Sequence, residues 1–287
     1  MLMKTNVFRL AWDIRHSVWL VSDPDVMSDL AGRVLSRQAV DLDYTPAHCE
    51  LFAESGRRVN AGEQGKSKSP MVAVVPLHGT MTKYRTCESD GTARLADIIS
   101  ELADDPSVVG MVLDIDSGGG AINSLPPLFS ALDRVRSAGK PVYAHCDLCG
   151  SAAYWAAIHC DAVYLDNRFS EVGSIGAFYH FVDTRAANPA TGEKEITIYA
   201  PESSAKNYSY RRALEGDFAP AEKELSRTVR DFQGEVKSRR SALKADAEGV
   251  LSGAMFKAAD ALKVGLADAV RNLDETVQAV FALASIN

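Results

Sequence analysis

The sequence predicts an α/β protein built from repeated ββα or βαβ units, with helices at its C-terminal end. Short apolar runs alternate along the chain with segments whose apolar residues recur every three or four positions. This alternation is typical of helices packed on a largely parallel sheet. The chain has 287 residues, 46% of them hydrophobic and 24% charged, which is enough apolar surface for one large domain with a modest appendage. Global disorder and a disulfide-stapled mini-domain are excluded.

The predicted strands are apolar runs short enough for strands that are buried on both faces. They cover residues 71–77, 108–115, 141–144 and 162–165. The predicted helices have apolar positions with helical spacing or, near residue 155, a run of small residues. They cover residues 26–38, 94–102, 125–137, 152–159, 219–243, 254–262 and 275–284.

A polar run divides the chain. Residues 54–68 are rich in Gly, Ser, Asn and charged side chains, which bury too little apolar surface to be held in place. We therefore expect an N-terminal accessory region over residues 1–53, a linker over residues 54–69 and the main domain over residues 70–287.

Charge and cysteine usage narrow the class of protein. The formal net charge of −7 would repel a polyphosphate, so we expect no nucleic-acid partner. An odd number of scattered cysteines indicates reduced thiols and a cytoplasmic setting. They are Cys49, Cys87, Cys146, Cys149 and Cys160. Charged residues interrupt the N-terminal apolar positions, and no run reaches the length of a membrane span. We expect neither a cleaved leader nor a membrane anchor.

A glycine-rich turn follows the second predicted strand. Residues 116–120 read Asp-Ser-Gly-Gly-Gly and precede a predicted helix. The backbone N–H groups of such a turn can face an anion and form half of an oxyanion hole. A plain tight turn is the alternative interpretation. The turn matches neither the dinucleotide nor the phosphate-loop pattern, so the sequence gives a nucleotide site little support.

A second turn places a serine at a strand-to-helix corner. Ser151 follows Gly150 and precedes the small-residue helix. A nucleophile for acyl transfer needs this geometry, because the next backbone N–H can stabilise the oxyanion. The alternative is a serine that caps the helix.

Composition alone does not identify the residue that acts as general base. No histidine stands in a context that marks a triad, although His78 and His145 are available. A buried lysine can serve instead, because desolvation lowers its pKa from about 10.4 towards neutrality. His145, Cys146 and Cys149 also allow a thiol or metal site, and Cys149 is a possible nucleophile, but a single CxxC is a weak zinc signal.

Five segments together resemble peptidase family S49, which includes the signal peptide peptidase A group and phage proteases that process capsid or scaffold proteins. The matching pieces follow the family's order and fall between about residues 71 and 270. They are VVGMVLDIDSGGG (108–120), CGSAAYWAAIHCDAVYLD (149–166), EVGSIGAF (171–178), ITIYAPESSAK (196–206) and LSGAMFKAADALKVGLADAV (251–270).

The resemblance implies a crotonase-like or Clp-protease-like fold and a Ser/Lys dyad. Ser151 matches the nucleophile, and Lys206 matches the base. The backbone amides of Gly119 and Ala152 match the oxyanion hole, and Ser174 matches the serine that orients the lysine.

Two departures from the family pattern concern this site. Relatives commonly place the lysine about two residues earlier, where this chain has Ser204, so Lys194 is the reserve base. Glu202 lies close enough in sequence to raise the pKa of a nearby lysine. Gly118 stands where many relatives have proline, which loosens the turn but keeps the donor.

The leading hypothesis is therefore a serine endopeptidase that needs no metal or other cofactor. Its expected substrate is a phage capsid, scaffold or portal-region protein, and its expected location is the host cytoplasm or the phage prohead. By resemblance it forms a homo-oligomeric ring. The alternatives are a crotonase-like acyl-transfer enzyme and a non-catalytic capsid assembly component.

Overall fold

Strands and helices alternate through most of the fold. In the computed structural model, the described residues are 18–21, 49–59, 69–86, 89–180 and 197–286. The strands are β1 (Trp19–Val21), β2 (Glu50–Ala53), β3 (Arg58–Val59), β4 (Met71–His78), β5 (Val108–Ser117), β6 (Gly119–Ala121), β7 (Val142–Gly150), β8 (Ala162–Leu165), β9 (Glu171–Gly173), β10 (Met255–Lys257) and β11 (Ala269–Val270). The helices are α3 (Thr92–Asp104), α4 (Leu125–Ser137), α5 (Ala152–Ala157), α6 (Tyr208–Leu214), α7 (Ala219–Arg239), α8 (Ala258–Val264) and α9 (Leu273–Ala284).

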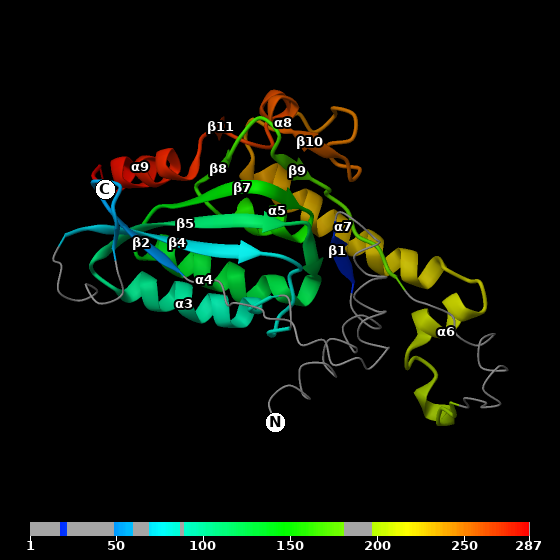
Figure 1. The fold of residues 1–287 in the computed structure, drawn as a ribbon. Coiled ribbons are helices and arrows are strands. Elements are labelled where there is room, and N and C mark those ends of the chain that lie inside the picture. Colours follow the sequence, from blue (N-terminus) through cyan, green and yellow to red (C-terminus); the bar gives the residue numbers. More distant parts are fainter. Residues whose placement is uncertain (1–17, 22–48, 60–68, 87–88, 181–196, 287) are drawn as a thin grey trace, which may run out of the picture.

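The central sheet is largely parallel. β4, β5 and β7 pair in parallel, and β8 and β9 each pair in parallel with β7. At the two borders β2 pairs antiparallel with β4, and β10 pairs antiparallel with β9. β1 and β6 form a separate antiparallel pair, which lies at the carboxyl ends of β4 and β5 (Figure 1). The turns that follow the central strands therefore meet at one edge of the sheet.

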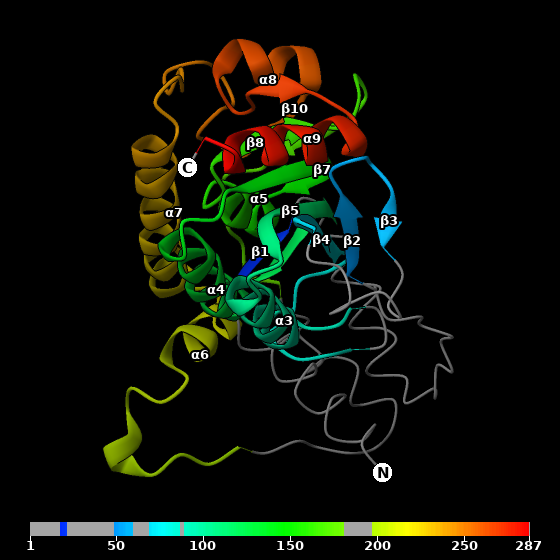
Figure 2. The ribbon, with the colours of Figure 1, turned by 90° about the vertical axis from the view of Figure 1, so that its left-hand side faces the viewer.

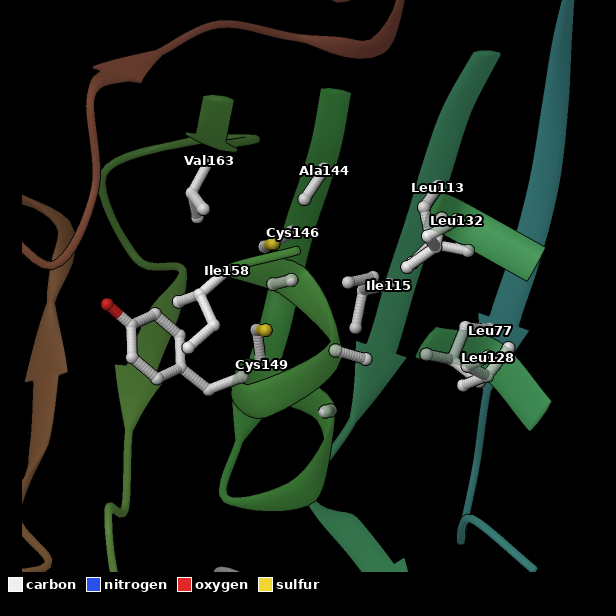
Figure 3. Packing of buried hydrophobic residues seen from close by; sticks show 14 of the residues in the cluster. Leu77, Leu113, Ile115, Leu128, Leu132, Ala144, Cys146, Cys149, Ile158 and Val163 are labelled. Atoms are coloured by element: carbon white, nitrogen blue, oxygen red, sulfur yellow. The ribbon is translucent and has the colours of Figure 1, made fainter. Parts of the chain in front are cut away.

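The sheet is covered on both faces. Side chains such as Leu113 and Ile115 pack with Leu128 of α4 in the larger apolar cluster (Figure 3). The opposite face packs against α9, where Val112 and Val280 share a second cluster. Figure 2 shows α3 and α4 on one side of the sheet and α9 on the other. This two-sided burial is the physical reason why the central strands are almost uniformly apolar.

Most of the predicted elements are confirmed. The strand predicted at residues 162–165 and the helix predicted at residues 125–137 have the bounds of β8 and α4. The strand predicted at residues 141–144 continues as far as Gly150, because its partners β5 and β9 keep the later residues in the sheet.

Two segments differ from the prediction. The helix predicted over residues 254–262 is a strand followed by a helix, because residues 255–257 pair with β9 before α8 begins. β2 falls in the predicted accessory region and β3 in the predicted linker, yet both belong to the central sheet. The predicted helix at residues 26–38 lies outside the described residues.

Helix α7 is anchored to α5. Phe232 stacks on Trp155 with ring centroids 4.4 Å apart, and Glu235 accepts hydrogen bonds from Trp155 and His159. The Tyr154 hydroxyl donates to the carbonyl of Leu266, so the aromatic pair of α5 is packing. Towards its N-terminal end α7 extends away from the sheet together with α6 (Figures 1 and 2). No helix in the described part of the chain is both long and apolar enough to cross a bilayer.

Candidate active site

Ser151 occupies the corner between β7 and α5. Its φ of 54° and ψ of −115° form a combination that costs a non-glycine residue on the order of 1–3 kcal/mol. Its backbone N–H donates to the carbonyl of Gly173 at 2.8 Å. The side chain makes no capping hydrogen bond to α5; instead Oγ donates to the carbonyl of Gly176 at 3.3 Å. The hydroxyl therefore does not act as a helix cap, which was the alternative interpretation.

Ser174 lies beside Ser151 because β7 and β9 run parallel. Gly150 is opposite Gly173 in the register, so the residues that follow these two strands are neighbours. Ser174 has a φ of 54° and is only 9% exposed, and its backbone N–H donates to the carbonyl of Ala254. The structure thus brings together two of the predicted site residues.

A positive φ occurs at two of the predicted site residues that are not glycine. Within the described ranges, the non-glycine residues with positive φ are Ser151, Ser174 and Asn207. The first two are predicted site residues, and the third follows Lys206. Such conformations persist only where the surroundings impose them, and they gather at functional sites. This pattern favours a functional role for both serines.

The glycine turn after β5 lies against the start of α5. Gly119 has a φ of 103°, and a Cβ added there would lie 2.9 Å from the backbone nitrogen of Ala152. The Ala152 N–H opens the helix and so has no partner within it. The Gly119 N–H donates to the hydroxyl of Ser117, which itself donates to the carbonyl of Gly79. The two predicted oxyanion donors are therefore neighbours.

Ser117 and strand β1 are neighbours of the site that the sequence interpretation missed. Ser117 directly precedes the glycines, and this position was its only signal. Strand β1 pairs along the glycine turn, and its three residues are too few for a periodic pattern to reveal.

Lys206 is separated from the two serines in the single chain. It is exposed in the turn that precedes α6, on the segment that extends from the body of the molecule (Figure 2). Its backbone N–H donates to the carbonyl of Ser203, whereas the Ser151 hydroxyl bonds to Gly176. Lys194 lies outside the described residues. The Ser/Lys dyad stays a prediction.

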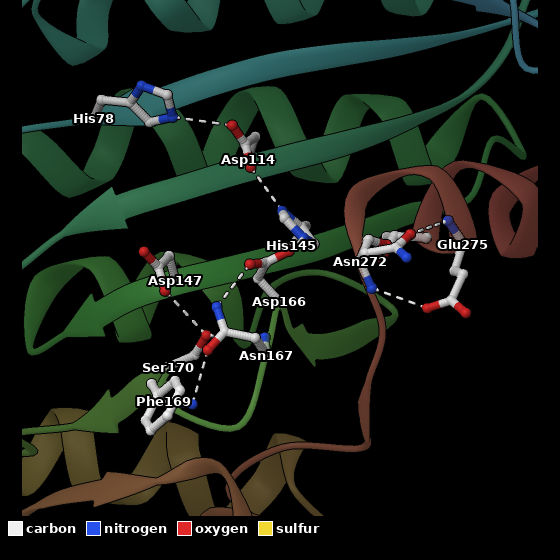
Figure 4. A network of polar contacts seen from close by, with 11 residues as sticks. His78, Asp114, His145, Asp147, Asp166, Asn167, Phe169, Ser170, Asn272 and Glu275 are labelled. Carbon is white, nitrogen blue, oxygen red and sulfur yellow. Dashed lines mark hydrogen bonds and ion pairs between the residues drawn. The ribbon is translucent and has the colours of Figure 1, made fainter.

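The histidines that could replace the lysine as base have other partners. His145 Nδ1 lies 2.7 Å from Asp114, and its Nε2 lies 3.1 Å from Asp166. His78 bonds to the second oxygen of Asp114 at 3.0 Å, as Figure 4 shows. These side chains lie on the sheet face opposite α5. No hydrogen bond joins Ser151 to a histidine in the described part of the chain.

Charge stabilises this histidine cluster. Burial would raise the pKa of Asp114, but hydrogen bonds from His145 and His78 outweigh it and lower that pKa to about 2. Burial would lower the pKa of His145, but Asp114 and Asp166 outweigh it and raise that pKa above 6.5. The Asp114 contribution is lost as the pH falls below about 4, and the His145 contribution is lost as the pH rises through its raised pKa.

We expect Asp114→Asn to lower the free energy of unfolding by about 2 kcal/mol at pH 5 and by clearly less at pH 9. The reason is that Asp114 faces His78 and His145, whose pKa values are both raised by Asp114 and which carry more positive charge at the lower pH. Denaturant unfolding at both pH values measures the difference. Asp104→Asn, which breaks the exposed ion pair with Arg134, is the control and should have a small effect at both. Equal losses at both pH values for Asp114→Asn would contradict this account.

The two thiols of the CxxC sequence belong to the core. Cys146 and Cys149 are fully buried in the apolar cluster that includes α5 (Figure 3), and burial raises the pKa of the Cys146 thiol. This placement contradicts a nucleophilic Cys149. Across the described ranges, no three His, Cys, Asp or Glu side chains are arranged to hold a metal ion.

Comparison with known proteins gives the family. The sequence model of peptidase family S49 matches residues 134–287. Protease 4 of Haemophilus influenzae is 24% identical over 212 residues, which cover 72% of this chain and 34% of Protease 4. The chain thus spans about a third of the length of this curated relative.

Similar solved structures include a stomatin-specific protease and a member of the enoyl-CoA hydratase/isomerase family. The membrane-bound stomatin-specific protease 1510-N, in a mutant complexed with a substrate peptide, has 16% identity and a TM-score of 0.44, with 71% of this chain and 76% of that chain covered. An enoyl-CoA hydratase/isomerase family protein from Silicibacter pomeroyi has 14% identity and a TM-score of 0.42, with 76% and 80% covered. Because the family's sequence model matches more than half of this chain, the chain belongs to peptidase family S49.

Proposed function

We propose that this chain is a serine endopeptidase with Ser151 as its nucleophile. The observation that carries the proposal is the strained corner of Ser151, which is held between β7 and α5 with Gly119 and Ala152 beside it. A serine in this position can present its oxygen to a carbonyl carbon while the Ala152 amide faces the oxygen of that carbonyl. The Gly119 amide, which donates to the Ser117 hydroxyl in the single chain, is the proposed second donor once it turns from Ser117 to the substrate.

The proposed reaction has two steps. Ser151 Oγ attacks the carbonyl carbon of a peptide bond and transfers its proton to the neutral amine of Lys206. The amides of Gly119 and Ala152 stabilise the oxyanion. The leaving amine takes the proton from Lys206 and departs, which leaves an acyl-enzyme on Ser151. A water then attacks the ester, with Lys206 again accepting and returning the proton.

The position of Lys206 suggests how the dyad is completed. In the single chain, Lys206 is exposed on a segment that extends beyond the sheet, while Ser151 is 1% exposed in the body. We propose that the active form is a homo-oligomeric ring in which this segment delivers Lys206 to a neighbouring copy. Ser174, adjacent to Ser151, would orient the arriving amine.

For the substrate we propose a phage capsid, scaffold or portal-region protein, cleaved in the host cytoplasm or the prohead. The support is the order of motifs, which resembles peptidase family S49, a family that includes phage proteases with such substrates. Co-expression with each candidate protein, followed by mass spectrometry of the fragments, identifies the substrate.

A serine-directed fluorophosphonate probe tests the proposed chemistry. We expect covalent labelling of Ser151 in the folded protein, located by peptide mass spectrometry, and none in heat-denatured protein, because only an activated serine reacts. Absence of labelling under conditions that allow cleavage of a protein substrate would contradict the proposed nucleophile. Absence of both labelling and cleavage would favour a non-catalytic assembly component.

A further inference from the structure

Strand β1 lies between two parts of the candidate active site. On one side it pairs antiparallel with β6, with Trp19 opposite Ala121, Leu20 opposite Gly120 and Val21 opposite Gly119. On the other side the backbone of Trp19 exchanges two hydrogen bonds with Phe178, at 3.1 and 3.0 Å. We call this place, between β6 and Phe178, the β1 position.

The β1 position adjoins the reacting groups. β6 begins with Gly119, and Phe178 is four residues beyond Ser174. A Cβ added to Gly119 would collide with the carbonyl oxygen of Leu20 and would lie 2.9 Å from the backbone nitrogen of Ala152. The carbonyl oxygen of Leu20 therefore lies against Gly119, on the side of Gly119 that also faces the backbone nitrogen of Ala152.

The direction of β1 is defined by its antiparallel register. Val21, at its C-terminal end, is opposite Gly119, and the chain enters from the side of Ala121. An extended segment that binds between two strand edges gains its affinity from backbone hydrogen bonds to those edges. Another polypeptide that reached Gly119 through hydrogen bonds to β6 and Phe178 would need the same two edges, which β1 already occupies.

Both β1 and Ser151 are buried. Trp19 and Leu20 are fully buried, and Ser151 is 1% exposed. A hydrolytic serine must meet the carbonyl carbon of its substrate, so a protein chain cannot reach Ser151 in this arrangement.

We propose that β1 is an intramolecular occupant of the substrate position and that it must leave before another polypeptide is cleaved. The part of this inference that concerns cleavage rests on the proposed function. The inference also implies that the position accepts extended segments with adjacent bulky apolar residues, as in Trp19-Leu20-Val21. Because β1 is tethered beside the β1 position, it competes with any other peptide. The apparent affinity for that peptide is its intrinsic affinity multiplied by the fraction of time for which the position is free.

A covalent lock tests the proposal. The N–H and C=O of Trp19 both bond to Phe178, so Trp19 and Ala121 form a non-hydrogen-bonded pair, whose close Cα approach suits a disulfide. In the full-length double variant Trp19→Cys/Ala121→Cys, we expect oxidation to lower peptide cleavage by at least about tenfold and reduction to restore it. Trp19→Cys alone, carried through the same oxidation, is the control. Unchanged cleavage after mass spectrometry confirms the disulfide would overturn the inference.

Binding measurements separate this inference from the proposed function. A fluorescent peptide with the sequence of residues 16–23 should bind Trp19→Ala protein at least about tenfold more tightly than wild type, and should not bind the oxidised lock. Phe52→Ala removes another buried ring, which packs in the cluster against α9, and should leave binding at the wild-type level. If no variant cleaves any peptide but this binding pattern holds, β1 is an occupant and the proposed activity fails. Equal binding by wild type and Trp19→Ala, with both folded, would overturn the occupancy.

Discussion

Replacing Ser151 with alanine is expected to lower peptide hydrolysis by at least about 10⁴-fold, because the change removes the attacking oxygen and with it the covalent route. The fold should persist. Alanine meets the same backbone strain at φ 54° as serine, and the change loses a single hydrogen bond of 3.3 Å to Gly176. Such a bond contributes about 1 kcal/mol.

Purified variant and wild type are to be compared by turnover of a fluorogenic peptide and by thermal unfolding. Ser170→Ala is a matched control. This change also removes a buried serine hydroxyl, which donates a hydrogen bond to Asp147 (Figure 4). Ser170 precedes β9 in the sequence, whereas Ser174 follows it. Near wild-type turnover by Ser151→Ala would exclude Ser151 as nucleophile.

Replacing Lys206 with alanine is expected to be as damaging as replacing Ser151, and the double variant should be no worse than either. The two groups carry out one proton transfer, so their losses do not add. Lys194→Ala should keep near wild-type activity. The reverse result, with Lys194 essential and Lys206 dispensable, would identify Lys194 as the base. Full activity of both variants would show that neither lysine is the base and would exclude the Ser/Lys dyad.

A mixing experiment tests whether Lys206 acts on a neighbouring copy. When Ser151→Ala and Lys206→Ala chains are unfolded together and refolded in equal amounts, roughly a quarter of the sites in a ring should join an intact serine to an intact lysine. Activity should then return although each variant alone is inactive. A mixture that stays inactive while wild type recovers under the same protocol would show that each chain must supply both groups.

The alternation of strands and helices could be predicted from the sequence because it depends on local patterns. The run at residues 162–165 is buried on both faces and became β8, and Pro126 and Pro127 in the first turn of α4 begin that helix where the periodicity does. Ser151 could be singled out because it follows a predicted strand and a glycine, and Ser174 because of the resemblance to the family; in the structure each directly follows a strand, β7 or β9. Parallel pairing of those strands then brings the two serines together.

Contacts between segments far apart in the chain were decided by the tertiary structure alone. The early residues of 254–262 have the apolar spacing of a helix, but an open edge of β9 takes residues 255–257 as a strand. His145 belongs to the opposite face of β7 from Cys146, since neighbours in a strand alternate. β1 has three residues and no local signal; it is a strand because β6 and Phe178 offer it two backbone edges beside Ser151. Local composition determined most of the strands and helices, whereas long-range backbone pairing determined β1 and β10 and which elements surround Ser151.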